Sequence, residues 1–87
     1  MRAVRFVDEA WNTYTWWQGQ DKKTLKRINL LIESARRTPF EGIGKPEPLV
    51  GSLAGYWSRR IDDTNRLVYR ATDDDLTIIA CRFHYGD

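Results

Sequence analysis

The sequence predicts an α+β fold in which two N-terminal helices pack on a small, mainly antiparallel, twisted sheet. Three observations lead to this fold class. Apolar residues recur at helical spacing in the first half of the chain, and three short strand-like segments separated by acidic turns make up the second half. A connection rich in glycine and proline, residues 39–55, divides the two halves. With 87 residues in total, we expect a single domain over residues 1–87.

The composition is that of a small globular protein and excludes several other classes. Hydrophobic residues make up 41% of the chain and aromatic residues 13%, which supplies large buried areas to a small core. No apolar run approaches the roughly 20 residues of a membrane span, and residues 1–6 lack the apolar run of a signal peptide. We therefore expect a cytoplasmic protein without membrane contact. The single cysteine, Cys81, lies among apolar residues and is expected to be buried.

The first half of the chain is expected to contain one strand and then a helix. Residues 3–7 form the strand, and Asp8 is expected to cap the helix that follows. Four residues of this helix recur at helical spacing and are expected to face the core: Ala10, Trp11, Tyr14 and Trp17.

A second helix is predicted directly after the first. Asp21 is its expected N-cap, and Pro39 pushes the preceding residue out of the helical region, so the helix should stop at Thr38. Its apolar face comprises Leu25, Ile28, Ile32 and Ala35. The two helices should therefore form a hairpin that packs on the sheet.

The second half is expected to form an antiparallel meander of three strands, residues 55–61, 66–72 and 76–85. If residues 73–75 form a three-residue loop, Arg66 lies opposite Arg82 and diagonal to His84 on the same face, whereas a two-residue loop reverses this arrangement. The same ambiguity at residues 62–65 leaves open whether Arg59 or Arg60 shares the face of Arg66.

Three residues of different chemistry stand out as a candidate site. His84 is the only histidine, and its side chain can give or take a proton near neutral pH, although a lone histidine at a strand end is more often structural. Glu47 lies between Pro46 and Pro48, which restrict its backbone, although a solvated loop glutamate is the simpler interpretation. Together with Arg66 they supply the base, the acid and the cation that RNA cleavage through the 2′-hydroxyl requires.

Several longer motifs resemble the YoeB toxins of the RelE superfamily. They are RRTPFEG at 36–42, KPEPL at 45–49, WSRRI at 57–61, RLVY at 66–69 and RFHY at 82–85. The resemblance covers nearly the whole chain, and it implies the RelE-like microbial RNase fold and a toxin of a type II toxin–antitoxin pair. It further implies cleavage of messenger RNA in the ribosomal A site of the 70S ribosome, and neutralisation by a YefM-type antitoxin.

The same resemblance implies roles for individual residues. Glu47 corresponds to the general base, Arg66 to the phosphate-stabilising cation, and His84 to the general acid, with Tyr85 assisting beside it. The candidate substrate-binding residues are Lys45, Arg59, Arg60, Arg82 and Phe83. With one histidine, one cysteine and acidic residues mainly in turns, the sequence offers no convincing metal site, so we expect neither metal nor other cofactor.

Two other functions compete with this hypothesis. A non-catalytic module would use its arginines to grip ribosomal RNA, and its action would not depend on Glu47 or His84. A free-standing RNase would cut naked RNA without ribosomes. A homodimer is a further expectation, since the tryptophan-rich first helix supplies a surface for self-association, although burial within one chain explains those residues equally well.

Overall fold

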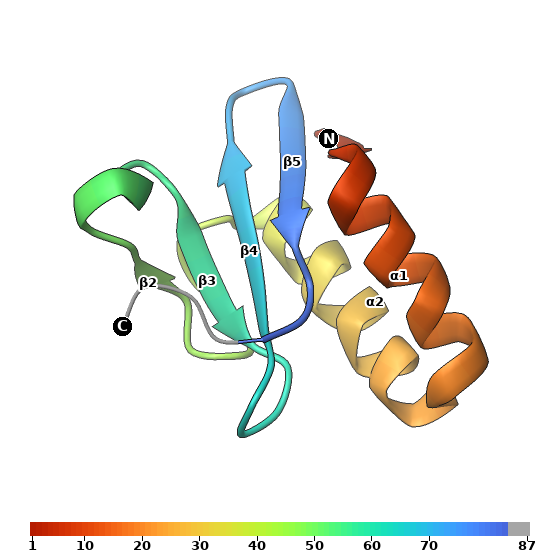
Figure 1. Cartoon of the computed structure of the whole chain (residues 1–87). Helices are drawn as coiled ribbons and strands as arrows, with labels where there is room; N and C mark the ends of the chain where they lie inside the picture. Colours follow the sequence, from red (N-terminus) through yellow and green to blue (C-terminus); the bar gives the residue numbers. More distant parts are fainter. Residues whose placement is uncertain (84–87) are drawn as a thin grey trace.

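Two helices cover one face of a five-stranded sheet in the computed structural model, which describes residues 1–83 (Figure 1). Along the chain, the elements are β1 (Ala3–Phe6), α1 (Asp8–Gln20), α2 (Lys22–Arg37), β2 (Glu47–Pro48), the 3-10 helix η1 (Gly51–Leu53), β3 (Trp57–Arg60), β4 (Arg66–Ala71) and β5 (Asp75–Ala80). No helix within the described range is long and apolar enough to span a membrane.

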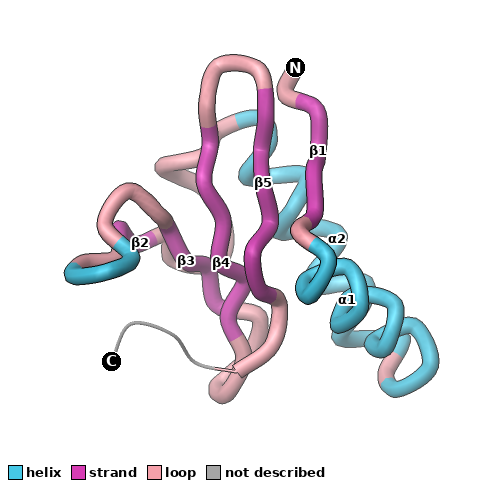
Figure 2. The backbone as a smooth tube through the Cα atoms, turned by 45° about the horizontal axis from the view of Figure 1, so that its top comes forward, coloured by secondary structure: helices cyan, strands magenta, loops and turns pink. Residues whose placement is uncertain are grey.

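The strand order is β1-β5-β4-β3-β2, and the expected meander of β3, β4 and β5 forms the centre of the sheet (Figure 2). β1 pairs with β5 in parallel at one edge, and the other three strand pairs are antiparallel. The prediction of a mainly antiparallel sheet is therefore confirmed. The sequence did not indicate β2, a two-residue strand that pairs with β3 at the other edge and places Glu47 opposite Ser58. Pro48 is tolerated there because an edge strand leaves one side of its backbone without a ladder partner.

The capping prediction is wrong for the first helix and confirmed for the second. Val7 occupies the N-cap position of α1, and Asp8 lies inside the first turn, where the helix dipole favours a negative charge. Asp21 caps α2 by accepting hydrogen bonds from the backbone N–H groups of Lys23 (3.0 Å) and Thr24 (3.4 Å). A hydrogen bond from the Thr24 hydroxyl, together with these backbone bonds, lowers the pKa of Asp21 below its ordinary value.

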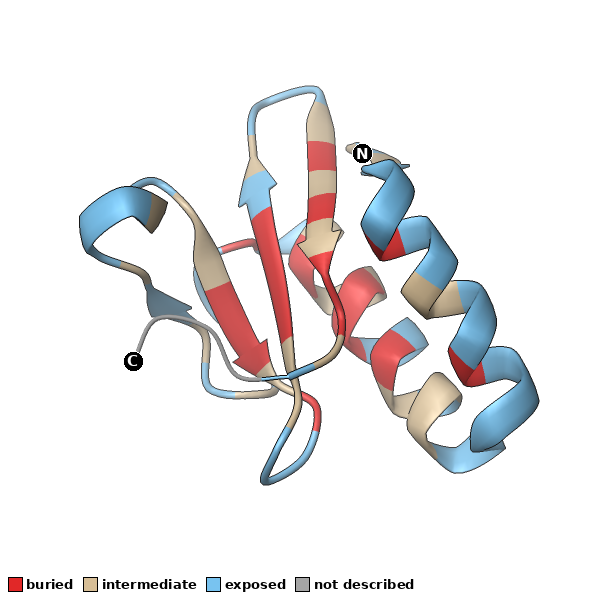
Figure 3. Ribbon diagram, in the orientation of Figure 1, coloured by how far each residue is buried: buried red, intermediate tan, exposed pale blue. Residues whose placement is uncertain are grey.

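The core lies between the helices and the sheet (Figure 3). α2 ends at Arg37 with Thr38 as its C-cap, as predicted, and buries one apolar face against the strands. The residues that meet in this core include Ile28, Leu31, Ile32, Ala35, Leu67, Tyr69, Leu76 and Ile78. Full burial of each large apolar side chain contributes about 1.5–3 kcal/mol to stability.

α1 packs on the core through Ala10 and Trp17, and the Trp17 indole N–H donates a hydrogen bond to the Cys81 carbonyl over 2.8 Å. Cys81 is buried as expected, and burial raises the pKa of its thiol to about 11. The prediction that Trp11 faces the core is wrong, since this side chain is 49% exposed. It lies against Phe6 and Tyr14 at the edge of the helix layer, with ring centroids 5.5 and 5.8 Å away.

The last strand is shorter than the predicted residues 76–85, because β5 ends at Ala80 and the chain then bends. The hairpin before it has the shorter of the two expected loops, with the Thr72 N–H donating to the Asp75 carbonyl over 2.8 Å. The pairing of β4 with β5 shifts its register between Val68 and Tyr69, and this shift compensates for the shorter loop. As a result, the Arg66 N–H bonds to the Phe83 carbonyl over 2.9 Å, and the backbone of Arg66 lies beside the residue that precedes His84.

Candidate functional site

Arg59 and Arg60 are neighbours on β3 that point to opposite faces of the sheet. Arg60 faces Arg66 across the strand pair, and this answers the question that the sequence left open. The side chain of Arg59 points toward the helices instead and is completely buried. The prediction that Arg59 binds substrate is therefore wrong, because no ligand on the open face of the sheet can reach it.

The Arg59 guanidinium is surrounded by oxygen atoms of the protein itself. Its Nε donates to the Tyr69 hydroxyl (3.0 Å), and its two terminal nitrogens donate to the hydroxyl of Ser34 (2.7 Å) and to three backbone carbonyls. Those carbonyls belong to Thr38, Glu41 and Ile43, at 2.7–3.1 Å. These contacts tie the connection between α2 and β2 to the sheet.

Gly42 allows the connection to lie this close to Arg59. Its φ of 117° lies in the region that favours glycine, and a Cβ atom there would lie 2.7 Å from the Ser34 hydroxyl and 3.2 Å from a terminal nitrogen of Arg59. Part of the motif at 36–42 therefore encloses a buried arginine.

The open face of the sheet carries a hollow of about 290 Å³ that unites four of the residues expected from the sequence. It is lined by Lys45, Glu47, Ser58, Arg60 and Arg66. One carboxylate and three cations therefore share a small surface that the helices do not cover. Like charges on directly opposed strand positions, as at Arg60 and Arg66, are unfavourable unless an anion lies between them.

Glu47 is held by the backbone around it, and its side chain makes no hydrogen bond or ion pair within residues 1–83. It is exposed, it pairs with Ser58 through β2, and it has a proline on each side. Because both prolines restrict the backbone, the Cα atom that carries the Glu47 side chain has a fixed position at the edge of the hollow. Ser58 is a site residue that sequence reasoning missed, and only its pairing with Glu47 identifies it.

Arg66 is anchored through one end of its guanidinium. One terminal nitrogen, Nη1, donates to the backbone carbonyls of Asp62 (2.7 Å) and Asn65 (3.1 Å). Within residues 1–83, its Nε and its other terminal nitrogen make no hydrogen bond. Arg66 therefore has a fixed direction and also N–H groups that are available to an anion.

Arg60 and Lys45 extend the basic surface beyond the first hollow. Both also line a second hollow of about 340 Å³, to which Arg27 contributes. Arg60 forms an ion pair with Asp63 at 3.4 Å, and since both side chains are exposed this pair adds little stability. The cations at the boundary of the two hollows are thus close to one another and accessible.

The turn between β3 and β4 is organised by Asp62. Its carboxylate accepts hydrogen bonds from the backbone N–H groups of Thr64 (2.8 Å) and Asn65 (2.7 Å), and from the Asn65 side-chain amide. Desolvation acts to raise the pKa of Asp62, but these hydrogen bonds outweigh that effect, so the pKa lies below its ordinary value. Sequence reasoning treated this segment only as an acidic turn.

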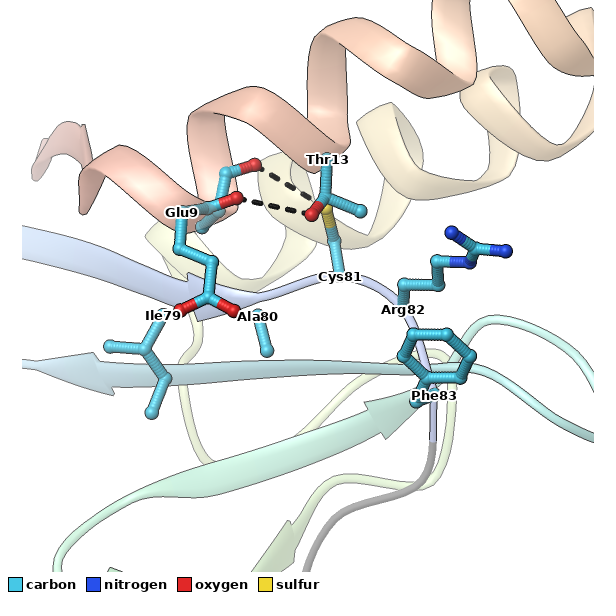
Figure 4. A pocket seen from close by; sticks show the side chains of 8 residues that line it. Glu9, Thr13, Ile79, Ala80, Cys81, Arg82 and Phe83 are labelled. Carbon is cyan, nitrogen blue, oxygen red and sulfur yellow. Dashed lines mark hydrogen bonds between the residues drawn. The ribbon is translucent and has the colours of Figure 1, made fainter.

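Arg82 and Phe83 do not line the hollow that contains Glu47, and instead lie beside Glu9 and Thr13 (Figure 4). The Arg82 guanidinium stacks on Trp16 of α1 at 3.9 Å and on the Phe83 ring at 4.5 Å. Both residues line a separate small hollow of about 90 Å³ beside Glu9 and Thr13. Substrate contact by Phe83, which is exposed, and by Arg82 stays a prediction, and the stacking of Arg82 joins residues 82–83 to α1.

The two remaining candidates, His84 and Tyr85, lie outside the described residues. Among residues 1–83, no group of three or more histidine, cysteine, aspartate or glutamate side chains is arranged to hold a metal ion. The described part of the site therefore consists of one carboxylate and a set of cations.

Fold and site together define a small α+β protein with a hollow on the open face of its sheet, lined by three cations and one carboxylate. Comparison with known proteins identifies its family. Residues 6–85 match the family described as "YoeB-like toxin of bacterial type II toxin-antitoxin system". The chain belongs to this family of toxins, and the resemblance inferred from its motifs is confirmed.

Individual relatives match along nearly their whole length. Toxin YoeB of Synechocystis is 60% identical over 82 residues, which cover 94% of this chain and 95% of the relative. The structure of a YoeB/ParE toxin from Agrobacterium tumefaciens superposes with a TM-score of 0.91 at 48% identity, and the match covers 98% of this chain and 100% of that one. The fold is thus the RelE-like fold that the resemblance implied.

Two structures from Staphylococcus aureus bear on assembly. One is a YoeB dimer, with a TM-score of 0.90, 44% identity and coverage of 97% of this chain and 98% of that one. The other is a YoeB–YefM complex, with a TM-score of 0.88, 42% identity and coverage of 98% and 99%.

Proposed function

We propose that this toxin is a ribosome-dependent endoribonuclease that cleaves messenger RNA in the ribosomal A site and so inhibits translation. The observation that carries the proposal is the hollow on the open sheet face, where Glu47 lies among Lys45, Arg60 and Arg66. A carboxylate can accept a proton there while the cations attract and orient a phosphate. Glu47, Arg60 and Arg66 come from strands of the sheet, which holds them in fixed relative positions, and Lys45 lies two residues before β2.

The proposed reaction is a transfer within the RNA strand. Glu47 removes the proton of a ribose 2′-hydroxyl, and the 2′-oxygen forms a bond to the adjacent phosphorus. Arg66 stabilises the negative charge that builds up on the non-bridging phosphate oxygens through N–H groups that are unused among the described residues. His84, assisted by Tyr85, gives a proton to the 5′-oxygen as the bond from that oxygen to phosphorus breaks. The products are a 2′,3′-cyclic phosphate and a 5′-hydroxyl end.

Dependence on the ribosome fits the shape of the site. The hollow lies on an exposed face, and Glu47 and Lys45 are both exposed, so the described residues do not enclose a flexible RNA strand. Positioning of the reacting atoms is worth a large part of a catalytic rate enhancement, and on the ribosome it would come from the A site. Arg27, Lys45 and Arg60 along the second hollow supply further charge for an RNA backbone.

The YoeB–YefM complex of the Staphylococcus aureus relative supports a YefM-type antitoxin as a partner of this chain. We expect that antitoxin to neutralise the toxin through a C-terminal segment that folds on binding. The dimer of that relative supports a homodimer of this chain. The 70S ribosome and messenger RNA are the proposed targets, which places the toxin in the cytoplasm.

The proposal is tested by mapping cut sites on one messenger RNA by primer extension, with and without 70S ribosomes. Wild type should cut only when ribosomes are present. Glu47→Ala and His84→Ala should each slow the cut about 10²–10⁴-fold, since each removes a proton-transfer group. Glu41→Ala is the matched control, because Glu41 is an exposed carboxylate of the same connection and lies outside the hollow.

Two outcomes would contradict the proposal in different ways. Translation arrest without any cut, unchanged in the Glu47→Ala and His84→Ala variants, would make the protein a non-catalytic ribosome-binding inhibitor. Equal cutting of naked RNA would make it a free-standing RNase.

A further inference from the structure

Phe83 has an unusual backbone conformation for a residue with a large side chain. Its φ is 63°, in the left-handed region that non-glycine residues rarely adopt, and its ring is 57% exposed. Burial of the side chain therefore does not explain the conformation. Such a conformation persists when surrounding contacts impose it, and it is often found near functional sites.

Hydrogen bonds on both sides of the Phe83 backbone supply those contacts. Its N–H donates to the side-chain oxygen of Asn65 over 2.8 Å, and its carbonyl accepts from the Arg66 N–H over 2.9 Å. The ring is held from another direction, since Arg82 stacks on it at 4.5 Å and on Trp16 at 3.9 Å. Phe83 is thus fixed at its backbone and at its ring, directly before His84.

Asn65 is itself fixed by the carboxylate of Asp62. The Asn65 amide nitrogen donates to both oxygens of that carboxylate, at 3.2 and 3.1 Å, which leaves the amide oxygen directed at Phe83. The backbone carbonyls of Asp62 and Asn65 also accept from the Arg66 guanidinium. One turn therefore orients the Arg66 side chain and holds the backbone of Phe83.

We propose that Asn65 is a positioning residue: its amide connects the Asp62 turn to the Phe83 backbone, and so fixes the residue that precedes His84 relative to Arg66. The inference rests on the proposed nuclease function, to which it adds one residue that does not touch the substrate. Loss of the contact should slow the chemical step and leave ribosome binding unchanged, since displacement of a reacting group by about 1 Å can cost up to about 100-fold in rate.

The test compares wild type with Asn65→Ala and with the double variant Asp62→Asn/Asn65→Asp. The double variant exchanges donor and acceptor between the two side chains and keeps an oxygen for the Phe83 N–H. Thr64→Ala is the matched control, because Thr64 is exposed in the same turn and its side chain makes no hydrogen bond within residues 1–83. Two quantities are measured: the hydrogen-exchange protection of the Phe83 amide by NMR, and the single-turnover cleavage rate over a range of ribosome concentrations.

We expect Asn65→Ala to remove the protection of the Phe83 amide and to lower the saturated rate about 10–100-fold, with less than a twofold change in the half-saturating ribosome concentration. The double variant should recover the rate to within about threefold of wild type, and Thr64→Ala should match wild type. A merely structural role would instead leave the saturated rate of the folded variant unchanged.

The inference is overturned if the Phe83 amide is unprotected in wild type, or if its protection is lost in Asn65→Ala without a change in the saturated rate. If wild type cuts no messenger RNA on ribosomes, the proposed function fails and the role of Asn65 in cleavage fails with it. Protection of the Phe83 amide in wild type distinguishes that failure from failure of the contact itself.

Discussion

Arg59 and Arg60 are consecutive residues on β3 with opposite environments. The Arg59 side chain is 0% exposed, and all five of its hydrogen bonds go to oxygen atoms of the protein. The Arg60 side chain is 41% exposed and faces Arg66 on the open side of the sheet. A cluster of arginines in a sequence can therefore contain both buried structural arginines and exposed ones that are available to a ligand. The two are told apart only by which face of the strand each side chain lies on.

The two environments also differ in how far their hydrogen-bonding groups have partners within the protein. The cluster around Arg59 joins α2, the connection at 38–43 and β4, so it holds together segments that are distant in sequence. The hollow around Arg66 leaves N–H groups and a carboxylate without partners among the described residues. Unused hydrogen-bonding capacity on a rigid surface is therefore the better sign of a ligand site than the abundance of arginine.

The largest effect expected concerns folding. Arg59→Ala should lower the free energy of unfolding by about 4 kcal/mol, because it leaves several buried oxygen atoms without hydrogen bonds and opens a cavity. Urea denaturation followed by circular dichroism measures this change. Arg60→Ala, the matched control, should stay within about 0.5 kcal/mol of wild type.

Arg59→Lys keeps the prediction testable if Arg59→Ala does not fold, since lysine retains the charge and three of the five donors. We expect it to lose about 2 kcal/mol, with residual stability sufficient for measurement. Equal urea midpoints for Arg59→Lys and wild type would remove the distinction between the two arginines.

The second effect concerns activity alone. Arg66→Ala should lower the cleavage rate on ribosomes about 10²–10³-fold, because it removes a preorganised cation from the phosphate. Its free energy of unfolding should change by less than about 1 kcal/mol, since the bonds of Arg66 are made near the surface. Arg70→Ala is the control, because Arg70 is an exposed arginine of the same strand outside the hollow. Equal cleavage rates for the two variants would contradict the assignment of Arg66.

The smallest effect concerns acid stability. The pKa of Asp62 is lowered in the folded state, so the stability that this carboxylate contributes is present above its unfolded pKa of about 3.9 and is lost as the pH falls through the folded pKa. Asp62→Asn should therefore lose less stability than wild type between pH 7 and about pH 2. The difference should stay below about 1 kcal/mol, because Asp62 is exposed. Urea titrations measure the free energy of unfolding at each pH. If wild type and Asp62→Asn lose the same amount between pH 7 and about pH 2, the hydrogen bonds of this turn are not coupled to folding.

Most features that depend on neighbouring residues were predicted well from the sequence, with the N-cap of α1 as the exception. The N-cap at Asp21, the stop at Thr38 and the restricted backbone of Glu47 all follow from two or three adjacent residues. The apolar spacing of α2 also predicted three of its buried residues, Ile28, Ile32 and Ala35, but it missed Leu31, and the predicted Leu25 is only partly buried. These are local signals, and they act whatever the rest of the chain does.

Features that depend on distant contacts were not predicted. The end of β5 is linked to Trp17, whose indole bonds to Cys81 across 64 positions, and β2 exists only through its pairing with β3. Arg59 could not be separated from Arg60 because the charge pattern does not say which face of β3 meets the helices. The contact from Asn65 to Phe83 spans 18 positions and leaves no periodic signal.

The most direct test of the account uses a messenger RNA with a single 2′-deoxynucleotide at the mapped cut site, in complex with the ribosome and wild-type toxin. We expect this substitution to abolish cleavage at that position, while the all-ribose control is cut to a 2′,3′-cyclic phosphate and a 5′-hydroxyl end. Cleavage of the deoxy-substituted messenger at the rate of the control would contradict attack by the 2′-hydroxyl, and with it the role of Glu47 as the base that activates it.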